Sequence, residues 1–585
     1  MLSWLWSPPE GVGKGGRKGG WRQQAAVEAG GEEVYGPSKL GCGLLLAWSD
    51  GNMSAAQLHG HSLNAREDGL MHPMINRFAS IAPLESPQHS QAGLTRLLQQ
   101  CGIPSLITRI PHGLITHMVL PSTLTRMIHD HYPAVFQTRF GATPENTKAF
   151  WQGFFGRPEN AEAIAVHPAL SGKTPDDLTY CIPCTLHQDA GPYSKRRSAE
   201  CISFSSLLGS GSEKTTKFLI CNTMKTRRSV PCDVAWPRLL EDWEAMARGE
   251  VNGRQIAGVA GGERWSFVLL YLKADEENQA NEWGLPHFAS NEPCPYCLCN
   301  RLTRPFTDLQ RTAAWRNNGH LPALVFCERL RTPRHPLLAL PQVHAYFSYP
   351  DLMHCMDCNG VCSLVYGGIL GVLLQDRRLG PNRDARLQHI NGMMRVWYAA
   401  HPDEHRLPPI LMSNVTSDGW CILSGQAIKA AAIRSARGFF QHLCQQYCTS
   451  GSRMDALLLA MMNDLSEFYT ILYTNGTFLS DEVLQRFQDV CISFGESYQE
   501  LRGICMDEEL LAFPVRPKCH RMQHLPRCAR TINPVALQCY AEESLVGTTT
   551  KVWKRSMAGR YEHVVQEAVL TKRLTGLLLR MLVGL

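Results

Sequence analysis

The chain has 585 residues, 44% of them apolar, and its 58 Lys and Arg against 52 Asp and Glu give a net charge of +6. This length and composition predict a globular protein of two to four domains, or one large domain with an insertion, and argue against a largely disordered chain. The N-terminal residues lack a secretory h-region, and the apolar runs at 360–374 and 574–585 are too short to span a bilayer. We therefore expect a soluble intracellular protein with reduced cysteines and no membrane contact.

The N-terminal part of the chain shows only weak hydrophobic periodicity. Residues 1–90 are sprinkled with Gly, Ser and His and show no lasting periodicity, which predicts a disordered leader. Residues 91–175 contain apolar residues at helical spacing, interrupted by proline and glycine, and predict a helical N-terminal region.

The sequence pattern changes from helical to strand-like at residues 176–280. Strand-like runs at 179–191, 199–209 and 216–224 are followed by a helical pattern at 233–250 and a nearly continuous apolar strand at 264–275. The order strand, strand, strand, helix, strand is that of the ribonuclease H core, in which the fourth strand lies beside the first. This predicts an α/β fold with a ribonuclease H-like mixed sheet.

The remaining chain completes that prediction. Residues 281–515 are mostly helical in pattern, with 453–475 the clearest amphipathic stretch, and predict a large α-helical insertion. Residues 516–585 then form the closing part of the core. The predicted architecture is a ribonuclease H-like sheet interrupted by helices, with a zinc knuckle at the start of the insertion.

Two acidic residues end the first and fourth predicted strands, namely Asp189 and Asp275. Neighbouring strands would bring them together, and converging carboxylates are what Mg²⁺ or Mn²⁺ requires for cleaving a phosphodiester. The alternative is that each is an ordinary strand-end acid in a turn, where Asp is common.

The stretch "EPCPYCLCNRLTR" at 292–304 contains Cys294 and Cys297 in a CxxC spacing. This spacing places two thiolates on one turn and suits a tetrahedral structural zinc site. A redox role is disfavoured, because the pair follows a loop and a proline instead of opening a helix after a strand. Packing thiols in a cysteine-rich chain are the alternative.

Four stretches together resemble the CACTA (En/Spm-like) and Plavaka-type DDE transposases: "HQDAGPYSK" (187–195), "KADEENQANEWGLPHFASNEPCPYCLCNR" (273–301), "YPDLMHCMDCNGVCSLVYGGILGVLL" (349–374) and "PKCHRMQHLPRCARTINPVALQCYAEESLVGTTTKVWKR" (517–555). The resemblance covers about 180–560 and implies Glu543 as the third acid, with Glu542 as its rival. The chain departs from the family at Ala190, which follows the first acid, and in Gly547 and three successive threonines, which are poor helix formers.

The resemblance further implies metal-dependent DNA cleavage and strand transfer, nuclear localisation, and possible assembly into a homo-oligomer on transposon ends and target DNA. It points to His354 as a third zinc ligand. The fourth stays open among Cys299, Cys355, Cys358 and His344. Two other functions remain in view: a non-catalytic, zinc-stabilised DNA-binding protein derived from a transposase, and a metal-dependent nuclease.

Basic residues bracket the predicted carboxylate site. They are candidates for contacts to DNA phosphates, which would make affinity fall steeply with salt, or else ordinary solvated charges. The candidate DNA-binding residues are Lys195, Arg196, Arg197, Lys551, Lys554 and Arg555, with a further basic run at 225–228.

Overall fold

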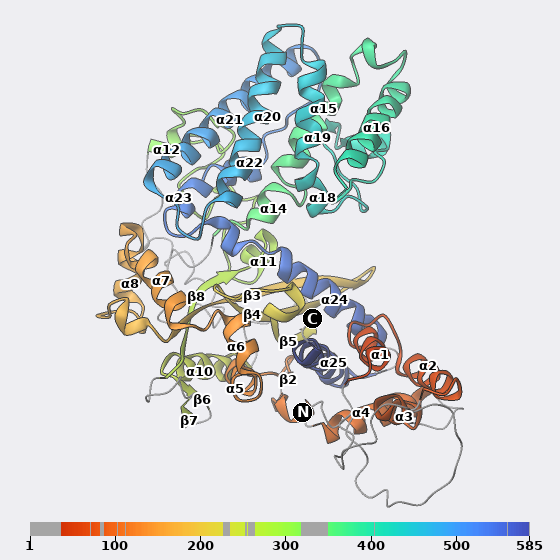
Figure 1. Ribbon diagram of the computed structural model, residues 1–585. Coiled ribbons are helices and arrows are strands. Elements are labelled where there is room, and N and C mark those ends of the chain that lie inside the picture. Colours follow the sequence, from red (N-terminus) through yellow and green to blue (C-terminus); the bar gives the residue numbers. More distant parts are fainter. Residues whose placement is uncertain are drawn as a thin grey trace, which may run out of the picture. The chain divides into compact units, whose positions relative to one another are not determined.

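A computed structural model of the chain describes residues 37–81 except 71, 87–225 except 102 and 112, 235–255 except 252 and 253, 264–317, 349–557 except 403, and 560–583. The chain divides into two compact units (Figure 1). The first contains residues up to 142, Asp189–Phe267 and Glu542–Leu585, and the second contains Thr143–Gln188 and Val268–Ala541. Three elements, β3, β8 and α24, pass from one unit into the other.

A mixed six-stranded sheet has the order β1-β2-β5-β4-β3-β8. The strands are β1 (Thr108–Arg109), β2 (His117–Met118), β3 (Cys181–Ser194), β4 (Arg197–Ser206), β5 (Phe218–Met224) and β8 (Ser266–Lys273). The predicted strands are therefore present, and the strands predicted as first and fourth are neighbours in the order. The short strands β1 and β2 were not predicted, because two residues leave no periodicity to detect.

Strand β3 is longer than the sequence pattern predicted. It does not end at Asp189 but continues to Ser194, and a two-residue turn at Lys195 and Arg196 leads into β4. Strand β4 then pairs antiparallel with β5, with a register shift between Ile202 and Ser203. The acid at position 189 thus lies within a strand, with its side chain only 4% exposed.

The predicted disordered leader is wrong for the described residues before 81. They form α1 (Lys39–Ser49), α2 (Ala55–Glu67) and α3 (Pro73–Ala79). Ser54 and Gln57 form a capping box at the start of α2, in which each side chain accepts from the other residue's backbone N–H. Leu45, Leu58 and Phe78 are fully buried, so these helices belong to a packed core. Residues 1–36 lie outside the described part of the chain.

The other helices of the first unit include the two C-terminal ones. They are α4 (Pro87–Gln100), α5 (Pro121–His131), α6 (Pro133–Phe140), α9 (Glu213–Thr216), α10 (Ala235–Ala247), α24 (Tyr540–Ser556) and α25 (Glu562–Val583). Strand β6 (Glu250–Val251) pairs antiparallel with β7 (Arg254–Gln255). Helix α25 packs against β5, where Glu562 accepts from the backbone N–H of Met224 and the hydroxyl of Thr223, both at 2.9 Å.

Helix α24 runs through the glycine and threonines that were expected to disfavour it. Thr548 and Thr549 donate their hydroxyls to the carbonyls of Ser544 and Leu545, one turn back. A Cβ at Gly191 would lie 2.8 Å from a methyl carbon of Val546, so β3 and α24 approach closely there. Tertiary packing therefore outweighs intrinsic helix propensity in this segment.

The second unit is mainly helical, as predicted for 281–515. Its helices are α7 (Pro144–Phe155), α8 (Ala161–Val166), α11 (Glu276–Asn281), α12 (Ala314–Asn317), α14 (Leu352–Met356), α15 (Val361–Leu373), α16 (Arg383–Ala400), α17 (Met412–Val415), α18 (Ala430–Ser435), α19 (Arg437–Tyr447), α20 (Arg453–Thr474), α21 (Asp481–Asp507), α22 (Pro517–Met522) and α23 (Leu525–Ala529). Strands β9 (Thr416–Ser417) and β10 (Trp420–Cys421) form a small ladder among them.

One large apolar core lies among the helices from α14 onward, and α15, α19, α20 and α21 contribute much of it. The apolar stretch Leu352–Leu373 has a mean hydropathy of 1.4 and is long enough to cross a membrane, but 83% of it is buried inside the protein. Burial of this kind is typical of a core helix in a globular domain.

Candidate metal centre

The sulfur atoms of Cys294, Cys297 and Cys299 and a ring nitrogen of His520 lie within 4.8 Å of one another. All four residues are buried and all belong to the second unit. The thiol of Cys297 lies 3.3 Å from Nε2 of His520. The group therefore has the donor atoms, the burial and the spacing to hold a metal ion such as zinc.

A second histidine adjoins this group. Nε2 of His524 lies 3.4 Å from the sulfur of Cys294 and 3.0 Å from Nε2 of His520. Ligand atoms around a tetrahedral zinc ion, at bonds of about 2.0–2.3 Å, are separated by about 3.3–3.8 Å. The four-residue group therefore supplies the four donors of a tetrahedral zinc ion, and His524 is a neighbour of two of its members.

Local structure explains how the cysteines reach this arrangement. They lie in an irregular loop that Asn300 closes, since its side-chain oxygen accepts from the backbone N–H groups of Leu302, Thr303 and Arg304. The backbone N–H of Tyr296 donates to the sulfur of Cys294 at 3.3 Å. Such donors stabilise a thiolate, which is the form that binds metal.

The histidines are positioned by helix α22 and the residue that precedes α23. They are four residues apart, so one helical turn brings both rings to the same side. The Trp315 ring packs against both, with centroid distances of 4.3 Å to His520 and 5.4 Å to His524. Trp315 is 3% exposed, so the cluster is shielded from water on that side.

The charges in the cluster are strongly interdependent. Burial would raise the pKa of Cys294, but hydrogen bonds from Cys297 and Cys299 and the nearby rings of His524 and His520 hold it well below its usual value. Hydrogen bonding with Cys294 and burial raise the pKa of Cys299 to about 12, against the opposing effect of the hydrogen bond with Cys297. Burial lowers the pKa of His520 to about 4, so its ring is neutral at physiological pH and suited to metal binding.

The predicted third ligand, His354, is not part of this group. Its Nδ1 lies 2.6 Å from a carboxylate oxygen of Asp351, the residue that caps α14. Burial would lower the pKa of His354, but Asp351 and Cys358 raise it well above its usual value, which describes a cationic ring instead of a neutral ligand. Of the open candidates Cys299 joins the cluster and Cys355 and Cys358 do not, whereas His344 lies outside the described residues.

The signal that the sequence interpretation missed is the spacing in "HRMQH" at 520–524. Two histidines at i and i+4 lie on one face of a helix, which is a common metal-ligand spacing. The segment is also buried, since His520 and His524 are each only 1% exposed.

The predicted catalytic acids lie in different surroundings. Asp189, on β3, accepts a hydrogen bond from the backbone N–H of Ala190 at 2.6 Å. Asp275 caps α11 by accepting from the N–H of Asn278 at 2.7 Å. Glu543 lies half-buried in the first turn of α24. The first and third acids belong to the first unit and Asp275 to the second.

The rival third acid has a structural partner. Glu542 is 1% exposed, and its carboxylate lies 2.9 Å from the ammonium of Lys217. A buried carboxylate engaged in this way stabilises the contact between α24 and the segment before β5.

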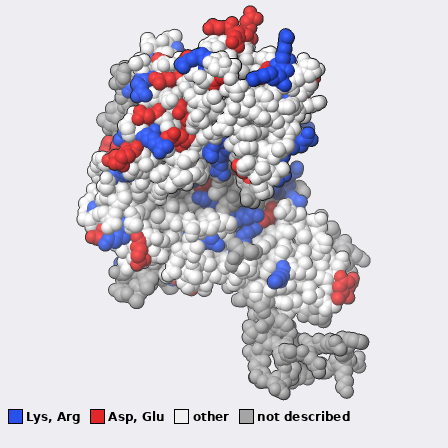
Figure 2. Space-filling model, turned by 45° about the horizontal axis from the view of Figure 1, so that its top comes forward, with Lys and Arg blue, Asp and Glu red and all other residues white. Residues whose placement is uncertain are grey.

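The candidate DNA-binding residues all lie in the first unit. Lys195, Arg196 and Arg197 are exposed around the β3–β4 turn, and Lys551, Lys554 and Arg555 are exposed on the last turns of α24. The rings of Tyr193 and Trp553, 5.9 Å apart, join the two elements. Of the run at 225–228, residues 226–228 lie outside the described part. On the face shown in Figure 2, cationic and anionic side chains are interspersed, in keeping with the small net charge.

Comparison with known proteins adds no evidence on the function of this site. No protein-family model matches the chain, and no curated protein is significantly similar to it.

Proposed function

We propose that this protein is a DDE-type DNA transposase, or a relative derived from one, with a ribonuclease H-like core interrupted by a helical insertion. The observation that carries the proposal is the strand order β5-β4-β3-β8. In this order, the strand that bears Asp189 is the neighbour of the strand that ends two residues before Asp275. A ribonuclease H-like core requires that adjacency.

In the proposed mechanism, Asp189, Asp275 and Glu543 hold two Mg²⁺ or Mn²⁺ ions. Carboxylates are the preferred protein ligands of these hard cations. When bound, the ions would supply Lewis-acid activation of water and stabilisation of the leaving oxygen. The three acids would position the phosphodiester for a first cleavage at the transposon end, and the freed 3′ hydroxyl would then attack target DNA in line.

Zinc is the proposed occupant of the cysteine and histidine cluster, in a structural role. Zinc would join the 294–299 loop to α22, two segments more than 200 residues apart in sequence. Structural zinc sites of this kind contribute on the order of 10 kcal/mol to folding. The Trp315 ring covers one side of the cluster, where a catalytic zinc ion would need a coordination position open to water. This covering favours a structural role for the metal over a catalytic one.

The proposed partners are transposon ends and target DNA in the nucleus, with assembly into a homo-oligomer. Support comes from the six exposed cations of the β3–β4 turn and α24, which lie on elements that pack together. Cations grouped on one unit can neutralise neighbouring phosphates and release counterions.

One observation favours a second candidate, a non-catalytic DNA-binding relative. Asp275 uses one oxygen to cap α11, and Asp189 accepts a hydrogen bond from the backbone N–H of Ala190, so two of the three acids already have local hydrogen-bonding roles. A protein that kept the fold and lost metal chemistry would retain these contacts. A metal-dependent nuclease is the remaining alternative.

Mn²⁺ binding by calorimetry distinguishes these functions. We expect Asp189→Asn, Asp275→Asn and Glu543→Gln each to abolish binding, while Glu277→Gln, an exposed acid on α11, leaves it intact. Folded wild-type protein that carries zinc and binds DNA but no Mn²⁺, with or without DNA present, would favour the non-catalytic candidate. Cleavage without strand-transfer products would favour the nuclease.

A further inference from the structure

A preformed pocket lies in the second unit, far in sequence from the metal cluster and from the acids. One face of α16 forms one wall, and the chain segment at 406–409 forms the other. Its volume is about 530 Å³, within the range of pockets that bind small organic ligands. The lining residues are Gln388, Asn391, Met394, Arg395, Tyr398, Arg406, Leu407 and Pro409.

Hydrogen bonds hold both ends of this pocket open. At one end the Asn391 amide donates to the carbonyl of Ile410 and accepts from its N–H, both at 2.9 Å. At the other end the Tyr398 hydroxyl accepts from the N–H of Leu407 at 3.2 Å. The segment is thus fastened to α16 on either side of the cavity, which needs no rearrangement to admit a ligand.

Two arginine side chains in the pocket lining make no ion pair with any described residue. Arg395 is exposed and has no ion pair or hydrogen bond within the described part of the chain, and Arg406 has only a backbone carbonyl, that of Tyr398. Burial raises the pKa of Tyr398, and Glu404 and Arg406 act on it in opposite directions, so a carboxylate and a guanidinium group both lie near its hydroxyl. Among the described residues that line the pocket, two are cationic and none is acidic.

The rest of the lining is apolar or neutral. Met394, Tyr398 and Leu407 are 3–4% exposed and form the floor, and Pro409 contributes the rim. Gln388 is exposed on the same helix face and offers both a donor and an acceptor. The pocket thus combines a cationic side, an apolar surface and an amide.

We propose that this pocket binds a nucleotide, that is, a phosphate monoester that carries a planar base, either free or at the 5′ end of a DNA strand. Arg395 and Arg406 bind the phosphate, for which the planar guanidinium is geometrically suited. The base packs on Met394 and Leu407, and Gln388 contacts its edge. Inorganic phosphate alone would leave most of the volume unfilled.

The test is methyl NMR of the full chain, zinc-loaded and labelled with [¹³C-methyl]methionine, with the Met394 signal assigned by Met394→Leu. We expect dAMP to shift that signal saturably. A 5′-phosphorylated oligonucleotide that shifts it more strongly than dAMP identifies a strand end as the source, and the reverse order identifies a free nucleotide. The same oligonucleotide with a 5′ hydroxyl should bind weakly.

Two variants make the result decisive. Arg395→Leu combined with Arg406→Leu should weaken dAMP binding by more than about tenfold, the loss expected for removing charge-assisted hydrogen bonds. Arg383→Leu, an exposed cation on the same helix outside the pocket, should not change it. An unmoved Met394 signal, an equal effect of inorganic phosphate, or unaltered affinity in the double variant would each overturn the proposal.

Discussion

The Nε2 atoms of His520 and His524 lie 3.0 Å apart, and each is within 3.4 Å of a cysteine sulfur. Two ring nitrogens that converge on thiols in this way are better explained by a shared cation than by their own hydrogen bonds. This relationship, more than the CxxC alone, makes the cluster a candidate metal centre.

The first prediction concerns which side chains bind zinc. We expect one zinc ion per chain by elemental analysis, and its loss together with folding in Cys294→Ser/Cys297→Ser. Cys505→Ala, a buried cysteine elsewhere in the second unit, should retain zinc. Because His524 adjoins the four-residue group and offers a substitute donor, Cys299→Ser should keep stoichiometric zinc at reduced affinity, and His524→Gln should also keep it. Complete loss in Cys299→Ser would show that His524 is not a ligand.

The sequence predicted half of this centre for a physical reason. The two cysteines of a CxxC are brought together by a single turn, so their spacing alone is informative. Their histidine partner is fixed by tertiary folding across 223 residues, and sequence spacing carries no information about that distance. His354 was chosen from a resemblance, and the structure instead pairs it with Asp351.

The fold was predictable to a similar degree. Long buried strands and the amphipathic helix α20 follow from periodicity, and both are present where expected. The Gly-rich composition of the N-terminal region predicts disorder and conceals its helices. The pair Ser54 and Gln57, which forms a capping box, is the local signal that predicts one of them. The ribonuclease H-like relationship of the sheet stays a prediction.

A second prediction concerns Asp357, which is 1% exposed and accepts hydrogen bonds from the hydroxyls of Tyr469 and Tyr540. Burial raises its pKa from 3.8 to about 7, against the opposing effects of the two tyrosines and Arg434. A raised carboxyl pKa means that the folded state binds the proton more tightly than the unfolded state. Its contribution is therefore complete below pH 3.8 and is lost as the pH rises through about 7.

Asp357→Asn should remove this dependence, because the amide resembles the protonated acid in shape and charge. We expect the variant to gain stability relative to wild type as the pH rises from about 4 to 7, by a total of a few kcal/mol. Urea unfolding at several pH values measures the difference. If the free energy of unfolding changes with pH in the same way for both proteins, Asp357 does not titrate as assigned.

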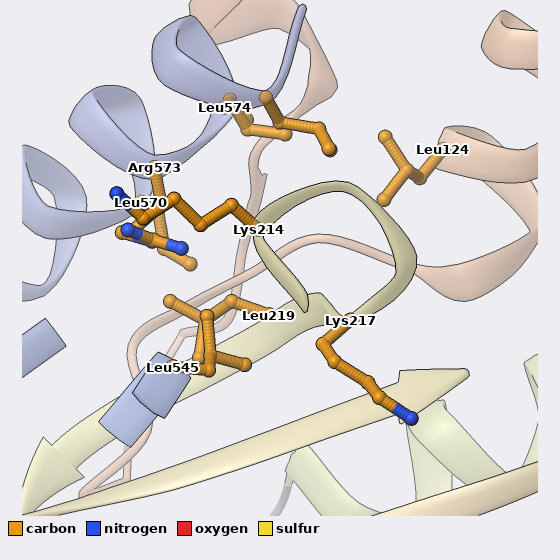
Figure 3. A pocket seen from close by; sticks show the side chains of 9 residues that line it. Leu124, Lys214, Lys217, Leu219, Leu545, Leu570, Arg573 and Leu574 are labelled. Atoms are coloured by element: carbon orange, nitrogen blue, oxygen red, sulfur yellow. The ribbon is translucent and has the colours of Figure 1, made fainter. Parts of the chain in front are cut away.

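A third prediction concerns Asp50, a carboxylate shared by three cations in the first unit. It lies 2.6 Å from Arg580, 3.3 Å from Lys214 and 3.7 Å from Arg573. Lys214 and Arg573 line a cavity of about 10 Å³ with several leucines, and their charged ends turn to the same side, whereas Lys217 points away (Figure 3). Burial would raise the pKa of Asp50, but the Arg580 hydrogen bond and the three positive charges lower it.

Asp50→Asn should therefore destabilise the protein by about 3–5 kcal/mol, because it leaves buried guanidinium groups unpaired. Asp68→Asn, an exposed acid at the end of α2, should cost less than about 0.5 kcal/mol. The Asp50 contribution is present above pH 3.8 and disappears as the pH falls through the lowered folded-state pKa. Equal stabilities of the two variants in denaturant titrations would show that the cluster is not an ion-pair network.

A fourth prediction separates the two adjacent glutamates of α24. Glu542→Gln should cost about 3 kcal/mol, since it leaves the Lys217 ammonium, only 16% exposed, without its carboxylate. Glu543→Gln should change stability by less than about 0.5 kcal/mol, since this residue is half-buried on the helix. Thermal unfolding measures both. If Glu543→Gln is the more destabilising variant, Glu543 has a structural role and its assignment as the third acid fails.

The last prediction concerns the six exposed cations of the β3–β4 turn and α24. If they contact DNA phosphates, the logarithm of affinity should fall linearly with the logarithm of salt concentration, with a slope of about −0.9 per phosphate contacted. Replacing Lys195, Arg196 and Arg197 with Gln should make that slope shallower by about 2–3, because up to three contacts are lost. Fluorescence anisotropy with duplex DNA at several salt concentrations measures both slopes.

The control removes charge from the second unit instead. Arg377→Gln/Lys429→Gln changes two exposed cations on the helical unit and should leave the slope unaltered. A loss of affinity that is the same at every salt concentration would indicate damage to folding and not lost phosphate contacts, since counterion release alone gives the salt dependence. An equal change of slope in the control would mean that the cations of the β3–β4 turn act only through net charge, and the proposed interface on the first unit would then be withdrawn.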